Sequence, residues 1–80
     1  MEELILNLAK LHTTELGVGR IKRNLGLDTD DIVAWCKQKI KNHRCSVVRR
    51  DKNWYSCIGD CETTVDTHSY SIITAHKIYR

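Results

Sequence analysis

The stretch "NWYSCIGDCETTV", residues 53–65, decides the fold of this chain. Two runs of strand-forming residues flank the dipeptide Gly59-Asp60, and such a pair between two strand-like runs favours a tight hairpin turn. We therefore predict two antiparallel strands, at 53–58 and 61–65.

Strand patterns continue on both sides of this hairpin. "CSVVRR" (45–50) has the period of a strand and is followed by the turn "DKN". After the turn "DTHS", the segment "YSIITAHKIY" (70–79) is the most apolar strand candidate. Four sequential strands with short links favour an antiparallel meander between residues 45 and 79.

Residues 3–42 carry apolar side chains at helical spacing instead. Three helices are predicted, in "EELILNLAKL", "LGVGRIKRNL" and "DIVAWCKQKIKN". Thr13 or Thr14 is the expected N-cap of the second helix, and Gly26 is its expected left-handed C-cap. Helices before strands predict one α+β domain over residues 1–80, with about three N-terminal helices packed on one face of a four-stranded antiparallel sheet.

The charge pattern is moderately basic. The 80 residues carry a formal net charge of +3, and the basic residues cluster in "GRIKR", "KQKIKNHR" and "RRDK". Such clusters are compatible with RNA or a nucleotide as partner, and equally with solvated helix faces. No segment approaches the roughly 18 apolar residues that a membrane span needs, and the acidic start is unlike a signal peptide. We therefore expect a cytoplasmic protein with no membrane partner.

The four cysteines form no C-x2-C pair. Cys57 and Cys61 are the nearest pair, and the turn between them is expected to bring their sulfurs close. They would be the first ligands to test for zinc, but the spacing of all four favours free thiols in a reducing compartment. We predict no metal, no disulfide and no cofactor.

Residues 67–77, "THSYSIITAHK", gather polar groups around a strand-like centre. Side chains on a strand alternate between its two faces. One face of this strand is therefore predicted to carry four candidate catalytic residues: His68, Tyr70, Thr74 and His76. Ile73 and Ala75 fall on the other face, under a helix. The alternative is that the four polar residues form the ordinary outer face of a small sheet.

A ribonuclease that works without metal needs a general base, a general acid and a cation for the phosphorane charge. His68 and His76 are the candidates for base and acid. Eight residues of extended strand would separate them by about 26 Å, so only one of them can act on a given phosphate. The second group must then come from another element, such as His12 or Arg20.

The candidate ligand-binding residues are His12, Thr14, Arg20 and Lys77. Thr14 stands at the start of a predicted helix, whose free N–H groups favour a phosphate or carboxylate. Arg20 would extend from that helix and grip two anionic oxygens. The alternative is that Thr14 only caps the helix and that Arg20 only pairs with a surface acid.

Two further functions remain open from the residues alone. "RRDKNWY" (49–55) interleaves basic and aromatic residues, which suits a non-catalytic module that binds nucleic acid or a nucleotide. A small protein-interaction domain is the other alternative, with the strand at 45–50 as an exposed docking edge.

Three segments resemble a small bacterial family, mostly from Firmicutes, that is catalogued as a domain of unknown function. They are "LHTTELGVGRIKRNLGL" (11–27), "VAWCKQKI" (33–40) and "NWYSCIGDCETTVDTHSYSIITAHK" (53–77). This resemblance covers most of the chain and assigns no catalytic residues.

A more distant resemblance is to the fold shared by barnase, EndoU, colicin ribonucleases and RelE toxins. "SYSIITAHKIYR" is similar to the final strand of several such toxins. This resemblance implies a metal-independent endoribonuclease of the RelE-like toxin type acting on RNA, with an antitoxin-like protein as partner. The N-terminal helix lacks the density of basic residues usual in RelE-type toxins.

Overall fold

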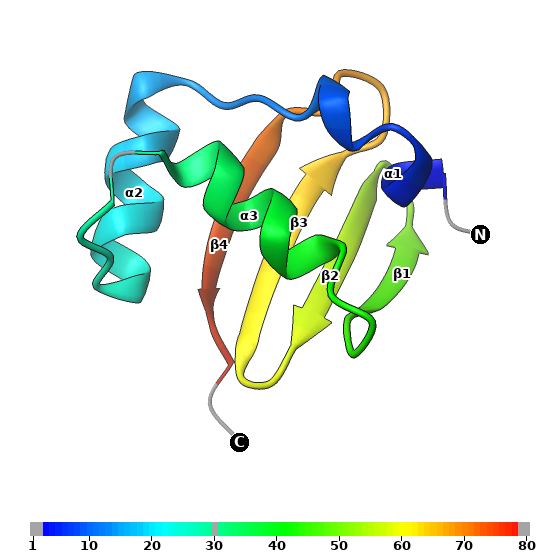
Figure 1. Cartoon of the computed structure of the whole chain (residues 1–80). Helices are drawn as coiled ribbons and strands as arrows, with labels where there is room; N and C mark the ends of the chain where they lie inside the picture. The colour runs from blue at the N-terminus through cyan, green and yellow to red at the C-terminus, as the bar shows by residue number, and fades with distance from the viewer. Residues whose placement is uncertain (1–2, 30, 79–80) are drawn as a thin grey trace.

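The computed structural model describes residues 3–29 and 31–78. The helical half consists of α1 (Glu3–Leu6), a 3-10 turn η1 (Leu8–Lys10), α2 (Glu15–Leu25) and α3 (Ile32–Ile40). The sheet consists of β1 (Ser46–Arg50), β2 (Asn53–Ile58), β3 (Cys61–Asp66) and β4 (Ile72–Lys77). The predicted α+β fold class is confirmed: the helices come first and lie on one face of a four-stranded antiparallel sheet (Figure 1).

The strands follow one another in the order β1-β2-β3-β4, as the predicted meander requires. Residues 59–60 form the turn between β2 and β3, and Ile58 pairs directly with Cys61 across it. Gly59 has φ 58°, a left-handed conformation that glycine adopts without strain. The sequence therefore predicted this hairpin and its turn correctly.

The first predicted helix is interrupted. The chain leaves the α-helix after Leu6 and continues as the 3-10 turn η1. At the break, the Asn7 side-chain amide donates to the carbonyl oxygen of Glu3 at 2.9 Å, and this local bond competes with continued helix formation. The break leaves Leu4 and Leu11 both buried in the core.

Both ends of α2 follow the predicted capping pattern, and α3 begins with a side-chain cap as well. Thr14 Oγ1 accepts a 3.0 Å hydrogen bond from the Gly17 N–H, which fixes Thr14 as the N-cap of α2. Gly26 ends the helix with φ 64°. Asp31 caps α3 by accepting from the Ala34 N–H at 3.1 Å.

The segment between η1 and α2 is fastened to the start of β4. The His12 N–H donates to the Tyr70 carbonyl at 3.2 Å, and the Ile72 N–H donates to the His12 carbonyl at 2.8 Å. Thr13 adds a hydroxyl hydrogen bond of 3.0 Å to the Ile72 carbonyl. These bonds engage the outer edge of β4, and α2 packs on the same strand. This edge of the sheet is therefore covered (Figure 1).

The predicted alternation along the last strand is wrong at its start. β4 begins at Ile72, and its register with β3 shifts between Thr64 and Val65, where an extra residue forms a bulge. Ile72 and Ala75 are both buried in the core although three positions separate them, whereas Ile73 is 39% exposed. Residue 79, the expected end of this strand, lies outside the described residues.

The core lies between the helices and the inner face of the sheet. Trp54 is the largest fully buried side chain of the described residues. The other buried apolar residues come from every layer: Leu4, Leu11, Ile21, Ile32, Cys36, Ile40, Val65, Ile72 and Ala75. At about 25 cal/mol per Å² of buried apolar surface, this shared burial is the main force that holds the helices on the sheet.

The glycines of α2 provide a matched stability test. Gly19→Ala should raise the free energy of unfolding by about 0.5–1 kcal/mol, because nothing lies within 4 Å of the added methyl group and alanine favours helix. Gly26→Ala should lower it by about 1 kcal/mol, because the methyl group strains the left-handed C-cap. Gly17→Ala should also destabilise, since its methyl group would collide with the Thr13 hydroxyl that anchors α2 to β4. Urea denaturation of the three variants measures this, and equal stability of the Gly19 and Gly26 variants would contradict the assigned caps.

Candidate functional site

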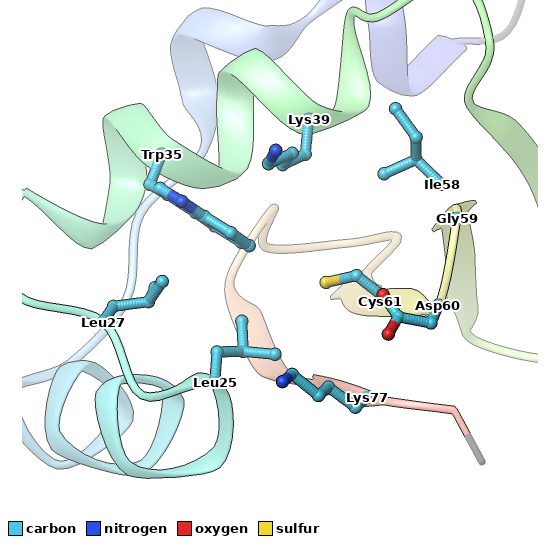
Figure 2. A pocket seen from close by; sticks show the side chains of 9 residues that line it. All are labelled: Leu25, Leu27, Trp35, Lys39, Ile58, Gly59, Asp60, Cys61 and Lys77. Atoms are coloured by element: carbon cyan, nitrogen blue, oxygen red, sulfur yellow. The ribbon is translucent and has the colours of Figure 1, made fainter.

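A cavity of about 320 Å³ opens at one end of the sheet, on the side that faces the helices (Figure 2). Its volume is within the range of small-molecule sites, about 300–1,000 Å³. The lining residues come from four parts of the chain: Leu25, Leu27, Trp35, Lys39, Ile58, Gly59, Asp60, Cys61 and Lys77. The wall is therefore mostly apolar, with two ammonium groups, one carboxylate and one thiol.

Local sequence rules place each part of this wall. Trp35 and Lys39 are four residues apart on α3, so they project from the same side of the helix. The left-handed turn at Gly26 reverses the chain between the two leucines of the wall, Leu25 and Leu27. The tight β2–β3 turn brings Ile58 and Cys61 opposite each other. Register then places Lys77 of β4 beside Cys61.

The charges of the cavity are not neutralised within it. Lys39 Nζ lies 5.2 Å from the centre of the Trp35 ring, a cation–π contact that holds the ammonium group at the aromatic wall. Lys77 is exposed at the rim, and no ion pair joins either lysine to Asp60 in the described chain. Two cations and one carboxylate leave this end of the cavity favourable to an anion.

The thiol of Cys61 points into the cavity (Figure 2). Burial raises the pKa of Cys61; the lysines Lys39 and Lys77 oppose this effect, and Asp60 adds to it. The thiol is therefore protonated at neutral pH, and it offers a ligand a weak hydrogen-bond donor rather than a nucleophilic thiolate.

The opposite face of the sheet carries a second polar group. Cross-strand partners share a face, and Cys57, Glu62 and His76 pair in sequence across β2, β3 and β4. The Cys57 thiol donates to Glu62 Oε2 at 3.5 Å, and Glu62 Oε1 lies 3.8 Å from His76 Nε2. No helix covers this face (Figure 1), so the carboxylate and imidazole remain accessible, and His76 is 45% exposed.

Comparison with known proteins gave a match to one family model. The model of the family described as a protein of unknown function (DUF3781) matches residues 5–76. The chain belongs to the DUF3781 family. This match spans the elements from α1 to β4 and confirms the predicted membership of an uncharacterised family. No curated protein and no solved structure matched, so the resemblance to ribonuclease toxins gains no support from these comparisons.

The DUF3781 fold separates the four predicted catalytic residues. Thr74 and His76 lie on the outer face of β4, as expected. His68 and Tyr70 do not belong to the strand, because they lie in the loop that precedes it. Tyr70 has φ 60°, and its ring packs 5.3 Å from Trp54 and 5.2 Å from Lys10 Nζ, which places it against the core.

The predicted ligand-binding residues are dispersed as well. His12 is bound through its backbone to β4, and its Nδ1 lies 3.0 Å from the Lys10 carbonyl oxygen. Thr14 caps α2, and Arg20 is exposed further along the same helix. Only Lys77 lines the cavity.

The cysteines Cys57 and Cys61 face opposite sides of the sheet. The two-residue turn pairs Ile58 with Cys61 and therefore pairs Cys57 with Glu62. The expected approach of the two sulfurs is wrong for this reason. Cys36 lies in the core, and burial, with a smaller contribution from Cys61, raises its pKa to about 12. In residues 3–29 and 31–78, no three His, Cys, Asp or Glu side chains are arranged to hold a metal ion.

Most of the cavity residues were not predicted from the sequence, and neither was Glu62, which joins Cys57 and His76 on the opposite face of the sheet. Trp35 and Lys39 carried a usable signal, since an aromatic and a basic residue four positions apart lie together on a helix. Leu25, Leu27 and Ile58 have the ordinary character of core residues, so nothing distinguished them. Glu62 became informative only when the β3–β4 register paired it with His76.

None of the helices in the described part of the chain has the length and apolar character needed to span a bilayer.

The loop before β4 supplies a pH-dependence test. The carboxylate of Asp66 accepts from the N–H groups of His68 at 2.7 Å and Ser69 at 3.0 Å, and the bond from Ser69, followed by that from His68, lowers the pKa of Asp66 below 3.8. Because the pKa is lower in the folded state, this stabilisation is complete above the unfolded value and is lost as pH falls through the folded value.

Asp66→Asn should therefore reduce the urea midpoint at neutral pH, and its difference from the unmodified protein should shrink as the pH falls below 3.8. Asp28→Asn, in the exposed loop after α2, is the control. A difference between Asp66→Asn and the unmodified protein that stays constant with pH would contradict the role assigned to the carboxylate.

Proposed function

We propose that this domain is a non-catalytic module that binds a small anionic ligand with a planar ring, of the mononucleotide class, in the cavity. The observation that carries the proposal is the pairing of two lysines, Lys39 and Lys77, with an apolar wall that includes Trp35. Apolar walls with a few convergent polar groups are the usual composition of small-molecule sites.

Each part of such a ligand has a matching group. A planar ring fits against Trp35, Leu25 and Leu27, where the walls remove apolar surface from water. A phosphate or carboxylate can be bound by the ammonium group of Lys77 at the rim, or by that of Lys39 beside Trp35, since lysine binds phosphate as a point charge. Asp60, at the rim, can accept a hydrogen bond from a ring amino group or a sugar hydroxyl.

Titration with nucleoside monophosphates tests this proposal by calorimetry. Lys77→Ala should weaken binding about tenfold, because one charge-assisted hydrogen bond to the anion is lost. Lys52→Ala is the matched control, since it removes an exposed lysine from the β1–β2 turn, away from the cavity wall. Unchanged affinity in Lys77→Ala, or equal losses in both variants, would contradict binding in the cavity.

The cysteines provide an internal control for the place of binding. A ligand in the cavity should slow alkylation of Cys61 and leave alkylation of Cys57, on the opposite face, unchanged. Mass spectrometry of each site resolves the two rates. Equal protection of both thiols would indicate a global change in stability instead of a bound ligand in the cavity.

A second candidate function is carried by the Glu62–His76 pair. A carboxylate and an imidazole on adjacent strands of an accessible face can serve as base and acid in metal-independent cleavage of RNA. Glu62 would replace the second histidine of the sequence-based hypothesis. Among the described strands, Arg50 is the arginine that the register places on this face, but a row of cross-strand pairs through Tyr55 separates it from Glu62, so it is not a close cation for the phosphorane charge. For this reason cavity binding is the first proposal.

Cleavage of a fluorescent RNA oligonucleotide in the presence of EDTA tests the second candidate. Glu62→Gln and His76→Ala should each reduce the rate about 10²–10⁴-fold, as loss of a general acid or base does. His68→Ala, in the loop before β4, should retain the full rate. Absence of cleavage by the unmodified protein, or cleavage that persists in both variants, would reject this function and leave cavity binding untouched.

A further inference from the structure

We propose that β1 is a docking edge for an acidic, extended segment of a partner protein, which adds to the sheet as a fifth strand. The proposal is independent of the cavity, because none of the cavity residues belongs to β1. It rests on the free edge of the sheet, on the direction of the backbone groups there, and on the charge around them.

β1 is the uncovered edge of the sheet. It pairs with β2 alone. The opposite edge of the sheet, along β4, is engaged by the His12 backbone and covered by α2. Four of its five residues are exposed: Ser46, Val48, Arg49 and Arg50. Val48 is an apolar side chain with 45% exposure, which a partner strand would bury.

The register identifies which backbone groups are available. Arg50 and Asn53 flank the two-residue turn, so they form a hydrogen-bonded pair. Hydrogen-bonded pairs alternate along an antiparallel ladder, so Val48 and Tyr55 form the next one. The N–H and C=O groups of the intervening residues, Val47 and Arg49, therefore point away from β2. No backbone hydrogen bond from loops or turns of the described chain reaches these two residues. Strand addition would satisfy these groups, as it does in other β-augmented complexes.

The charge at this edge selects the partner. Residues 44–52 contain four basic side chains (Arg44, Arg49, Arg50 and Lys52) and one acidic side chain. Arg50 lies on the outer face, 5.9 Å from the centre of the Tyr55 ring, and Arg49 projects to the inner face beside Trp54. An incoming strand with acidic residues would meet an arginine on either face. A second copy of β1 would instead place arginines against arginines, which disfavours self-pairing.

The test uses a labelled synthetic peptide in which glutamate alternates with valine, and a lysine–valine peptide as its counterpart. The acidic peptide should bind in fluorescence anisotropy and should slow amide hydrogen exchange at Val47 and Arg49. The lysine peptide should not bind. Protection at cavity residues alone, or absence of acidic-peptide binding, would overturn the proposal.

Two variants separate strand addition from charge attraction. Val47→Pro removes one outward N–H and keeps the net charge, and it should weaken binding about fivefold or more if that hydrogen bond is used. Arg49→Glu keeps the backbone intact and should weaken binding at least as much, and it serves if the proline variant fails to fold. Arg23→Glu, on the exposed surface of α2, is the charge-matched control for Arg49→Glu.

Circular dichroism establishes that each variant is folded. Unchanged peptide affinity in a folded Val47→Pro, or equal losses of affinity in Arg49→Glu and Arg23→Glu, would show that net charge alone explains binding. Either result would overturn strand addition. Displacement of the acidic peptide by a single-stranded RNA that binds the same edge more tightly would also overturn the assignment of a protein partner.

Discussion

The register of the β2–β3 hairpin is the constraint on which both candidate sites depend. Because the turn contains two residues, Ile58 pairs with Cys61 and Cys57 pairs with Glu62. A shift of one residue would exchange the two faces of the strand, since side chains alternate. Cys61 would then leave the cavity and Glu62 would leave His76. Gly59 adopts the positive φ of this tight turn without strain, and it thereby supports the register on which both faces depend.

The second constraint is the attachment of the segment before α2 to the start of β4. Thr13 contributes a hydroxyl hydrogen bond to β4, while the neighbouring Thr14 caps the helix. Two adjacent threonines thus fix the position of α2 on the strand and the direction in which the helix leaves it. Gly17 permits this arrangement because a methyl group there would occupy the space of the Thr13 hydroxyl. The end of α2, with Leu25 and Leu27, is positioned at the cavity as a consequence.

These two constraints explain which parts of the structure could be predicted from the sequence and which could not. Helix caps and tight turns depend on residues within a few positions of one another, so Thr14, Gly26 and the Gly59 turn were predictable. The bulge at Ile73 depends on how β4 fits both β3 and the attached segment. Strict alternation cannot reveal such a bulge, and the predicted face of Ile73 was wrong for that reason. The predicted faces of His68 and Tyr70 were wrong because the strand begins only at Ile72.

The candidate sites were harder to predict, because each combines segments that only the fold brings together. In the cavity, residues from the end of α2, α3, the β2–β3 turn and β4 meet, although 52 positions separate Leu25 from Lys77. The histidines were conspicuous by residue type, but residue type carries no information about convergence. His76 gained a partner from the neighbouring strand, and His68 became part of a turn held by Asp66. The sheet thus keeps a partly open cavity with two lysines apart from an uncovered face with a carboxylate and an imidazole. A concave apolar wall favours binding because it removes part of a small ligand from water, whereas an uncovered sheet face favours contact with a large polymer. This difference in shape, more than the residue types alone, is why we assign the small ligand to the cavity and keep RNA for the outer face.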